Sequence, residues 1–334
     1  MKKIAVITSG GDAPGMNACM RAIVNTAWQH DLEVIGFRHG FRGIVEDLNV
    51  PLHPDDMRLV SQRGGTFLKS SRYPEFREVE VAQKAAAVLD SHGIVGLIVI
   101  GGDGSFRGAH HLNQYWDGQV IGVPGTIDND LAGTDVTIGF ATAVDTAMDA
   151  IDKVRETAEA MARVFIIEVM GRHAGFIGLH AAIAAAAEAM ILPELEPQPK
   201  LAELADGILQ ARSAFPDSSY VVILSENLWP GGVHELSKNL TKATGVTCHP
   251  CPLGHIQRGG RPNAQDRILA MQLGAAAVDA ILSGETAIMI GLEQEHVVTV
   301  PLHLTFERDK PLDPRLVQLQ LGLQGVNIAS KGDE

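Results

Sequence analysis

A short apolar run that ends in a glycine turn constrains the fold of this chain more than any other stretch. Residues 95–100 read as a buried parallel strand, which Gly101 and Gly102 interrupt before a helical pattern that we expect to start near Phe106. At such a corner, backbone N–H groups and the positive end of the helix dipole face a ligand. The segment IVIGGDGSFRG (98–108) therefore predicts a phosphate-binding turn in an open α/β sheet, with a purely structural tight turn as the alternative.

Asp103 stands at the expected carboxyl end of that strand, where open α/β sheets bind their ligands. A carboxylate in this place can hold a Mg²⁺ ion that arrives with phosphate groups. The pattern GGDGS lacks the Gly-Lys-Ser/Thr of a Walker loop, and it is not the GxGxxG of a dinucleotide site. The motif alone therefore predicts phosphate binding without defining a reaction.

The same strand, glycine loop and helix occur at the start of the chain. Residues 4–8 predict a strand, residues 9–15 (SGGDAPG) a second glycine loop, residues 16–29 a helix and residues 33–37 the next strand. Further helices are expected at 79–91, 139–162, 200–213, 233–243 and 264–282 and from Phe176, and further strands at 120–123, 163–170, 189–192, 220–224, 287–292 and 296–300. This alternation predicts an α/β fold with doubly wound parallel sheets.

Length and charge narrow the classes of function. A chain of 334 residues can form two domains, and its net charge of −13 argues against binding nucleic acid or an anionic membrane. The start of the chain reads as a strand rather than a signal peptide, and the apolar stretch 174–192 reads as a buried helix and strand. Its three cysteines form no disulfide framework. We therefore expect a cytoplasmic protein with no nucleic-acid or membrane partner.

An acidic loop follows the strand predicted at 120–123. It contains Asp128, Asp130 and Asp135 with almost no cation nearby in the sequence, which is costly unless a metal or a proton transfer uses these groups. If the backbone is extended, Asp128 and Asp130 share a face, so that one can accept a hydroxyl proton while the other faces a metal. Asx turns and helix capping are the alternative roles.

Four motifs, GGDGS, PGTIDND, MGRHAG and GHIQRGG, follow in this order, and through them the chain resembles the bacterial 6-phosphofructokinases. The resemblance implies two Rossmann-like, doubly wound domains with mainly parallel sheets in three αβα layers. The larger, ATP- and Mg²⁺-binding domain would comprise 1–139 and 252–305, the smaller, sugar-phosphate-binding domain 140–251 and 306–322, and the tail 323–334. The implied reaction transfers a phosphoryl group from MgATP to the 1-hydroxyl of fructose 6-phosphate, giving fructose 1,6-bisphosphate and ADP in glycolysis.

The resemblance also assigns roles to single residues. Asp128 would be the general base, Arg172 and Gly11 would stabilise the transferring phosphoryl group, and Thr126 and Asp130 would orient the acceptor. The ATP-binding residues would be Gly11, Arg72, Arg77, Gly102, Asp103, Gly104 and Ser105, with Asp103 on Mg²⁺. The sugar phosphate would contact Thr126, Asp128, Asp130, Arg163, Met170, Gly171, Arg172, Glu226, His249, His255 and Arg258. In the family Arg163 serves a neighbouring subunit's site, which implies a homotetramer.

Several positions bear on specificity. Gly104 and Gly125 indicate ATP as the donor, because pyrophosphate-dependent relatives typically carry Asp and Lys there. His249 stands where the family has an arginine on the 6-phosphate, and a neutral histidine cannot replace the guanidinium fork. Either sugar-phosphate binding is weaker and pH-dependent, or the acceptor is another ketose phosphate, or the loop is shifted and His249 is structural.

The effector site of the family is only partly matched. Arg21, Arg155 and Glu188 agree with it, whereas Asn25 and Pro54 replace expected arginines, so the resemblance implies an effector site that lacks two of its cations. The alternatives are a pyrophosphate-dependent phosphofructokinase and a catalytically inactive, sugar-phosphate-binding regulatory protein. An inactive protein would be expected to lack one of the groups that carry the reaction, yet Asp103, Asp128 and Arg172 are all present.

Overall fold

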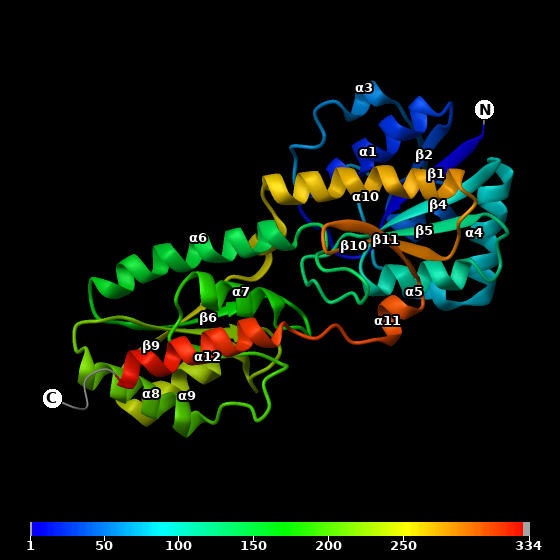
Figure 1. The fold of residues 1–334 in the computed structure, drawn as a ribbon. Coiled ribbons are helices and arrows are strands. Elements are labelled where there is room, and N and C mark those ends of the chain that lie inside the picture. Colours follow the sequence, from blue (N-terminus) through cyan, green and yellow to red (C-terminus); the bar gives the residue numbers. More distant parts are fainter. Residues whose placement is uncertain (1, 330–334) are drawn as a thin grey trace. The chain divides into compact units, whose positions relative to one another are not determined.

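The computed structural model describes residues 2–329, and the chain forms two compact units (Figure 1). The first comprises Met1–Thr142 and Arg258–Lys310, and the second comprises Ala143–Gln257 and Pro311–Glu334. The chain therefore passes between the units after residues 142, 257 and 310. The domain division expected from the resemblance has its crossing points a few residues earlier, after 139, 251 and 305.

The first unit is built on a seven-stranded sheet, counted over the described residues. Its strands are β1 (Lys3–Thr8), β2 (Glu33–Phe37), β3 (Asn49–Leu52), β4 (Ile94–Gly101), β5 (Gln119–Pro124), β10 (Ile288–Glu293) and β11 (His296–Pro301). They lie in the order β11-β10-β5-β4-β1-β2-β3. The five inner strands pair in parallel, and the edge strands β3 and β11 pair antiparallel with their neighbours.

Helices cover both faces of this sheet, as the strand–helix alternation predicts. They are α1 (Met16–Gln29), α2 (Gly40–Val45), α3 (Pro54–Met57), α4 (Val79–Ser91), α5 (Asp103–Leu112), α10 (Ala264–Leu282) and α11 (Leu304–Glu307), with the short 3-10 helix η1 (Pro74–Arg77). A second 3-10 helix, η2 (Gly254–Arg258), lies where the chain returns to this unit. Helices α1 and α10 pack together on one face, and α4 and α5 lie on the other (Figure 1). The first unit therefore has three αβα layers.

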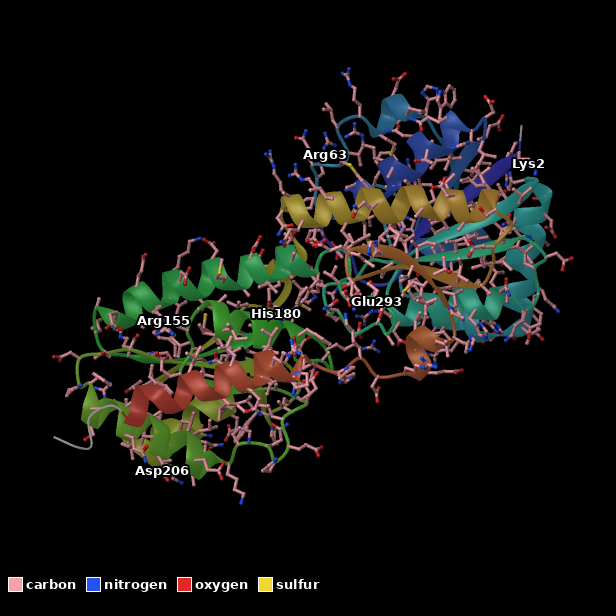
Figure 2. The ribbon with its side chains drawn as sticks, in the orientation of Figure 1. Lys2, Arg63, Arg155, His180, Asp206 and Glu293 are labelled. Carbon is pink, nitrogen blue, oxygen red and sulfur yellow. The ribbon has the colours of Figure 1, made fainter. Side chains whose placement is uncertain are left out.

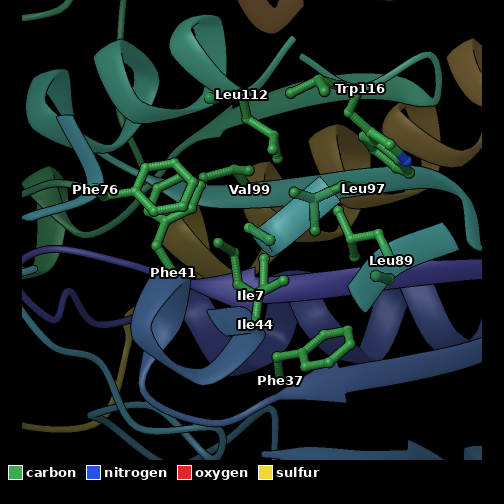
Figure 3. Close-up of a cluster of buried hydrophobic side chains, with 14 of the residues drawn as sticks. Ile7, Phe37, Phe41, Ile44, Phe76, Leu89, Leu97, Val99, Leu112 and Trp116 are labelled. Carbon is green, nitrogen blue, oxygen red and sulfur yellow. The ribbon is translucent and has the colours of Figure 1, made fainter. Parts of the chain in front are cut away.

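Strand residues alternate between the two faces. Ile7, Leu97 and Val99 point into the cluster beneath α4 and α5 (Figure 3), where the rings of Phe41 and Phe76 stack with centroids 4.2 Å apart. The residues between them in β1 and β4 are also buried, and they face α1 and α10. Burial on both faces explains why these strands read as continuous apolar runs.

The second unit contains a smaller, fully parallel sheet. Its strands are β6 (Val164–Val169), β7 (Ala189–Ile191), β8 (Tyr220–Ser225) and β9 (Cys248–Pro252), in the order β7-β8-β6-β9. Its helices are α6 (Phe140–Glu159), α7 (Phe176–Ala184), α8 (Leu201–Ala214), α9 (Gly232–Thr244) and α12 (Pro314–Ala329). Because α12 continues to Ala329, residues 323–329 of the expected tail are helical, and residues 330–334 lie outside the described part.

The apolar stretch 174–192 forms α7 and β7, as expected for a buried helix and strand. Over residues 2–329, the chain has no helix that combines the length and the apolar character needed to span a bilayer.

Candidate functional site

The strand order of the first unit reverses at β1. Strand β2, the next in the chain, pairs with one edge of β1, and β4 pairs with the other edge. The loops that follow β1 and β4 thus leave the sheet at adjacent positions, and β5 lies next to β4. In open α/β sheets, ligands bind at such a reversal, beyond the carboxyl ends of the strands.

The two glycine loops predicted from the sequence touch each other at this point. Ser9 N–H donates a hydrogen bond to the carbonyl of Ile100, at 3.0 Å. A Cβ atom at Gly101 would lie 2.5 Å from the hydroxyl of Ser105 and 2.8 Å from the carbonyl of Ser9. Only glycine fits between the loops at Gly101, so the sequence pattern reflects their close approach.

Helix α5 begins at Asp103, earlier than the start near Phe106 expected from the sequence. Gly102 has an extended backbone, with φ −104° and ψ −161°, and turns directly into the helix. Asp103, Gly104 and Ser105 therefore form the first turn, where amides lack intrahelical acceptors and the dipole favours negative ligands. This geometry supports the predicted phosphate-binding role of the loop.

Asp103 forms an ion pair with Arg107, whose Nε lies 2.9 Å from Oδ1 of Asp103. The Arg107 guanidinium also donates to the carbonyl of Phe306 at 2.9 Å and lies over its ring, 4.5 Å from the centroid. Among the described residues there is no group of three or more His, Cys, Asp or Glu side chains suited to a metal ion.

The loop after β5 is attached to the glycine loop after β4. Gly125 N–H donates to the carbonyl of Gly101 at 2.9 Å, and the side chains of Thr126 and Asp128 are buried. The Asp128 N–H donates to the hydroxyl of Thr126 at 3.2 Å. The assumption of an extended backbone at Asp128 and Asp130 is wrong: the chain bends at residues 127–128, and Asn129 has φ +56°. The spacing of the two carboxylates therefore does not place them on a shared face.

Asn129 and Lys310 are two residues that the sequence analysis missed. Asn129 is 3% exposed, and its side-chain oxygen accepts hydrogen bonds from Thr137 N–H at 3.0 Å and from Lys310 Nζ at 2.9 Å. Lys310 Nζ also donates to the carbonyl of Asp135 at 2.9 Å. Burial lowers the pKa of Lys310 to about 8, although Asp135 and Asp130 act in the opposite direction. Lys310 is 181 residues from Asn129, so no local pattern could reveal the contact.

Arg258 lies against the first glycine loop. Its Nη1 donates to the carbonyl of Asp12 at 3.4 Å, and a Cβ atom at Gly11 would lie only 2.1 Å from that nitrogen. Arg258 therefore contacts a glycine loop of its own unit. His255 is exposed in η2. Arg77 is exposed at the end of η1, and Arg72 is exposed just before η1.

In the second unit, the turn that follows β6 is held by a residue of the loop that follows β8. Oε1 of Glu226 accepts hydrogen bonds from Arg172 N–H at 2.9 Å and from Gly171 N–H at 3.3 Å. The φ angles of Gly171 and Arg172 are +146° and +60°. Met170 is buried beneath the turn, whereas Arg172 is exposed. The Glu226 carboxylate thus stabilises the unusual backbone from which Arg172 extends.

His249 lies on β9 and stacks on Phe165 of β6, with ring centroids 5.1 Å apart and planes inclined by 29°. This contact favours the structural alternative for His249, because the ring packs on its neighbouring strand. Arg163 is half-buried immediately before β6.

Two of the three expected effector residues form an ion pair in the second unit. Arg155, on α6 (Figure 2), donates from Nη1 to Oε1 of Glu188 at 2.9 Å. Its Nη2 also donates to the carbonyl of Ala186 at 2.9 Å. The third residue, Arg21, is in the first unit and donates to the hydroxyl of Ser61 at 3.2 Å.

The predicted site residues divide between the units as follows. The first unit contains Gly11, Arg72, Arg77, Gly102, Asp103, Gly104, Ser105, Thr126, Asp128, Asp130 and Arg258, and the second contains Arg163, Met170, Gly171, Arg172, Glu226, His249 and His255. Within the first unit, the loops after β1, β4 and β5 meet through the hydrogen bonds and close approaches given above. Within the second unit, Gly171, Arg172 and Glu226 meet through hydrogen bonds.

Comparisons with known proteins agree with this arrangement. The family model for phosphofructokinase matches residues 3–281. The chain is 48% identical over 320 residues to a Thermus thermophilus protein named ATP-dependent 6-phosphofructokinase 1, covering 96% of this chain and 98% of that protein. It is 43% identical over 319 residues to the ATP-dependent 6-phosphofructokinase of Thermotoga petrophila, covering 96% and 98% respectively.

Solved structures are similar over nearly the whole chain. The phosphofructokinase of Saccharomyces cerevisiae is 31% identical with a TM-score of 0.83, covering 98% of this chain and 47% of that one. A pyrophosphate-dependent phosphofructokinase from Marinobacter aquaeolei is 23% identical with a TM-score of 0.85, covering 99% and 93%. At that identity the second likeness concerns the fold alone.

Proposed function

Since the chain belongs to the phosphofructokinase family, we propose that Asp128 is the general base of the reaction it catalyses, phosphoryl transfer from ATP to fructose 6-phosphate. The single observation that carries the residue assignment is the meeting of three loops at the carboxyl ends of β1, β4 and β5. These loops combine helix amides and glycine turns, which suit phosphate groups, with the buried carboxylate of Asp128.

The 1-hydroxyl of fructose 6-phosphate gives its proton to the Asp128 carboxylate while its oxygen attacks the γ-phosphorus of ATP. The bond from that phosphorus to the bridging oxygen breaks, and ADP leaves. Phosphoryl transfer depends mainly on positioning and on neutralising charge, so the amide of Gly11 and the guanidinium of Arg172 are assigned to the transferring group.

We propose that Asp103 and the nucleotide phosphates hold Mg²⁺, which would neutralise charge on those phosphates. Nε of Arg107 is paired with Oδ1 of Asp103 at 2.9 Å, so Arg107 would compete with the ion for this oxygen. Gly11, Arg72, Arg77 and the loop 102–105 are assigned to ATP on the family pattern, which includes the first turn of α5.

Further residues are assigned to the sugar phosphate on the family pattern. Thr126 and Asp130 would orient the acceptor in the loop of Asp128. Met170, Gly171, Glu226, Arg163, His255 and Arg258 complete the proposed set, and His249 is left out of it because its ring stacks on Phe165. The hydrogen bonds of Glu226 suggest that it acts by holding the turn of Arg172, beside any contact with the sugar. On the family pattern we propose a cytoplasmic homotetramer in which Arg163 serves a neighbouring subunit.

The base assignment is tested with Asp128→Asn. Loss of the proton acceptor is expected to lower kcat by roughly 10²- to 10⁴-fold while leaving the dissociation constant for MgATP within about twofold. Asp117→Asn is the matched control, because Asp117 is exposed. An Asp128→Asn enzyme that turns over at the normal rate would remove Asp128 as the base.

A further inference from the structure

The acidic loop has a cation that is remote in sequence. Lys310 follows α11, and its ammonium group donates hydrogen bonds to the side-chain oxygen of Asn129 and to the carbonyl of Asp135, both at 2.9 Å. Asn129 lies between Asp128 and Asp130 in the chain. One ammonium group therefore connects the segment beside the proposed base to the far end of the same loop.

Asn129 transmits this contact to the backbone. It is 3% exposed, and its φ of +56° is a left-handed conformation that Asn tolerates better than most residues. Its side-chain oxygen also accepts a hydrogen bond from Thr137 N–H at 3.0 Å, and its side-chain nitrogen donates to the Asp135 carbonyl at 3.4 Å. The peptide that carries Asp128 is thus fixed on its carboxyl side by Asn129.

The position of Lys310 is costly for a charged group. It is half-buried, and burial lowers its pKa to about 8 even though Asp135 and Asp130 raise it. Placing a desolvated ammonium group here does not by itself favour folding. A cost of this kind is expected where geometry has a function.

We propose that Lys310 is a positioning residue for phosphoryl transfer: through Asn129 it holds the loop of residues 126–137 in the conformation that directs Asp128 at the acceptor hydroxyl. The inference rests on the proposed role of Asp128 as the base. Lys310 acts through another side chain and is not assigned a contact with substrate.

The test compares Lys310→Met with the wild-type enzyme in steady-state kinetics. Loss of the two hydrogen bonds is expected to lower kcat by about 10- to 100-fold, because small misplacements of a catalytic group have effects of this size. KM for ATP is expected to stay within about twofold, since the first turn of α5 is unchanged. Lys153→Met is the matched control, because Lys153 is an exposed lysine whose side chain is 70% accessible.

A double-mutant cycle separates positioning from general stabilisation. Glycine tolerates a positive φ, so Asn129→Gly is compatible with the backbone conformation at this position. The substitution removes the side-chain oxygen that accepts the hydrogen bond from Lys310. If Lys310 acts through Asn129, the double variant is expected to lose no more in kcat than the worse single variant. If the fold-loss in kcat of the double variant equals the product of the two single losses, the two residues act independently and the proposal is overturned.

The outcomes distinguish this proposal from the one on which it rests. A Lys310→Met enzyme with wild-type kcat, beside an inactive Asp128→Asn enzyme, overturns the role of Lys310 and leaves the base assigned. A normal rate for Asp128→Asn overturns both. Should Lys310→Met fail to fold, Asn129→Gly alone carries the test: a loss of about tenfold or more in kcat supports the proposal, and wild-type kcat contradicts it.

Discussion

Gly104 and Gly125 differ in what a side chain would meet. A Cβ atom at Gly104 would have no heavy atom within 4 Å, so packing does not require glycine there. At Gly125 it would lie 2.9 Å from Ile100 Cγ2 and 3.1 Å from Met16 Cε, so a larger residue would require these side chains to shift. Of the two residues taken to indicate ATP, Gly104 is therefore the more informative.

Gly104→Asp tests this difference. We expect the variant to fold with an unchanged melting temperature, and to lose about tenfold or more in kcat/KM for ATP because the carboxylate repels phosphate in the first turn of α5. Gly104→Ala is the control for size without charge. Unchanged use of ATP by Gly104→Asp would contradict the role given to this residue.

Lys310 predicts a pH dependence of stability. Its pKa is about 8 in the folded protein, against an ordinary value of 10.5, so the unfolded chain binds more protons between these values. The contribution of this residue to stability is therefore expected to increase as pH rises from about 8 to 10.5. Melting temperatures of wild type and Lys310→Met at about pH 7.5 and 9.5 measure it. The melting temperature of the wild type relative to that of Lys310→Met is expected to be higher at about pH 9.5 than at about pH 7.5. No such increase would contradict the prediction.

At the scale of elements, the regular strands and helices could be predicted because apolar periodicity and glycine turns are local signals. Helices α1, α4 and α10 begin and end at the residues expected from the sequence. Strand β3 and the short helices α2 and α3 were not expected, since segments of four to six residues carry too weak a pattern. The bend at residues 127–128 was missed because the left-handed conformation of Asn129 is fixed by contacts with Thr137 and Lys310.

The start of α6 also depends on a contact that sequence cannot reveal. Asp266, on the first turn of α10, is 1% exposed and accepts hydrogen bonds from Gly139 N–H at 2.8 Å and Thr142 N–H at 2.7 Å. It also accepts one from the Thr142 hydroxyl. These partners lie more than a hundred residues earlier in the chain, so helix capping by Asp266 is invisible to a local reading.

Asp266→Ala is expected to lower the free energy of unfolding by on the order of 3 kcal/mol, because buried donors lose a charged acceptor. Denaturant unfolding measures this change. Asp279→Ala is the matched control, since Asp279 is exposed on the same helix. Equal stability of the two variants would show that the cap contributes little.

At the scale of the whole molecule, the four motifs that carry the family resemblance fall on loops of the two units. GGDGS and PGTIDND follow β4 and β5 in the first unit, MGRHAG follows β6 in the second, and GHIQRGG (254–260) spans the point where the chain returns to the first unit after Gln257. Sequence order and spacing could identify the motifs, because each is a local pattern. The contacts that hold them, such as Arg258 on Gly11 and Lys310 on Asn129, join distant segments and required the fold.

The most direct test of the account compares phosphoryl donors. Initial rates are measured on the purified protein with fructose 6-phosphate and Mg²⁺, with either ATP or pyrophosphate, over a range of sugar phosphate concentrations. We expect turnover with ATP, formation of fructose 1,6-bisphosphate and negligible rates with pyrophosphate. Turnover with pyrophosphate in place of ATP, or no turnover of fructose 6-phosphate with either donor, would contradict the account.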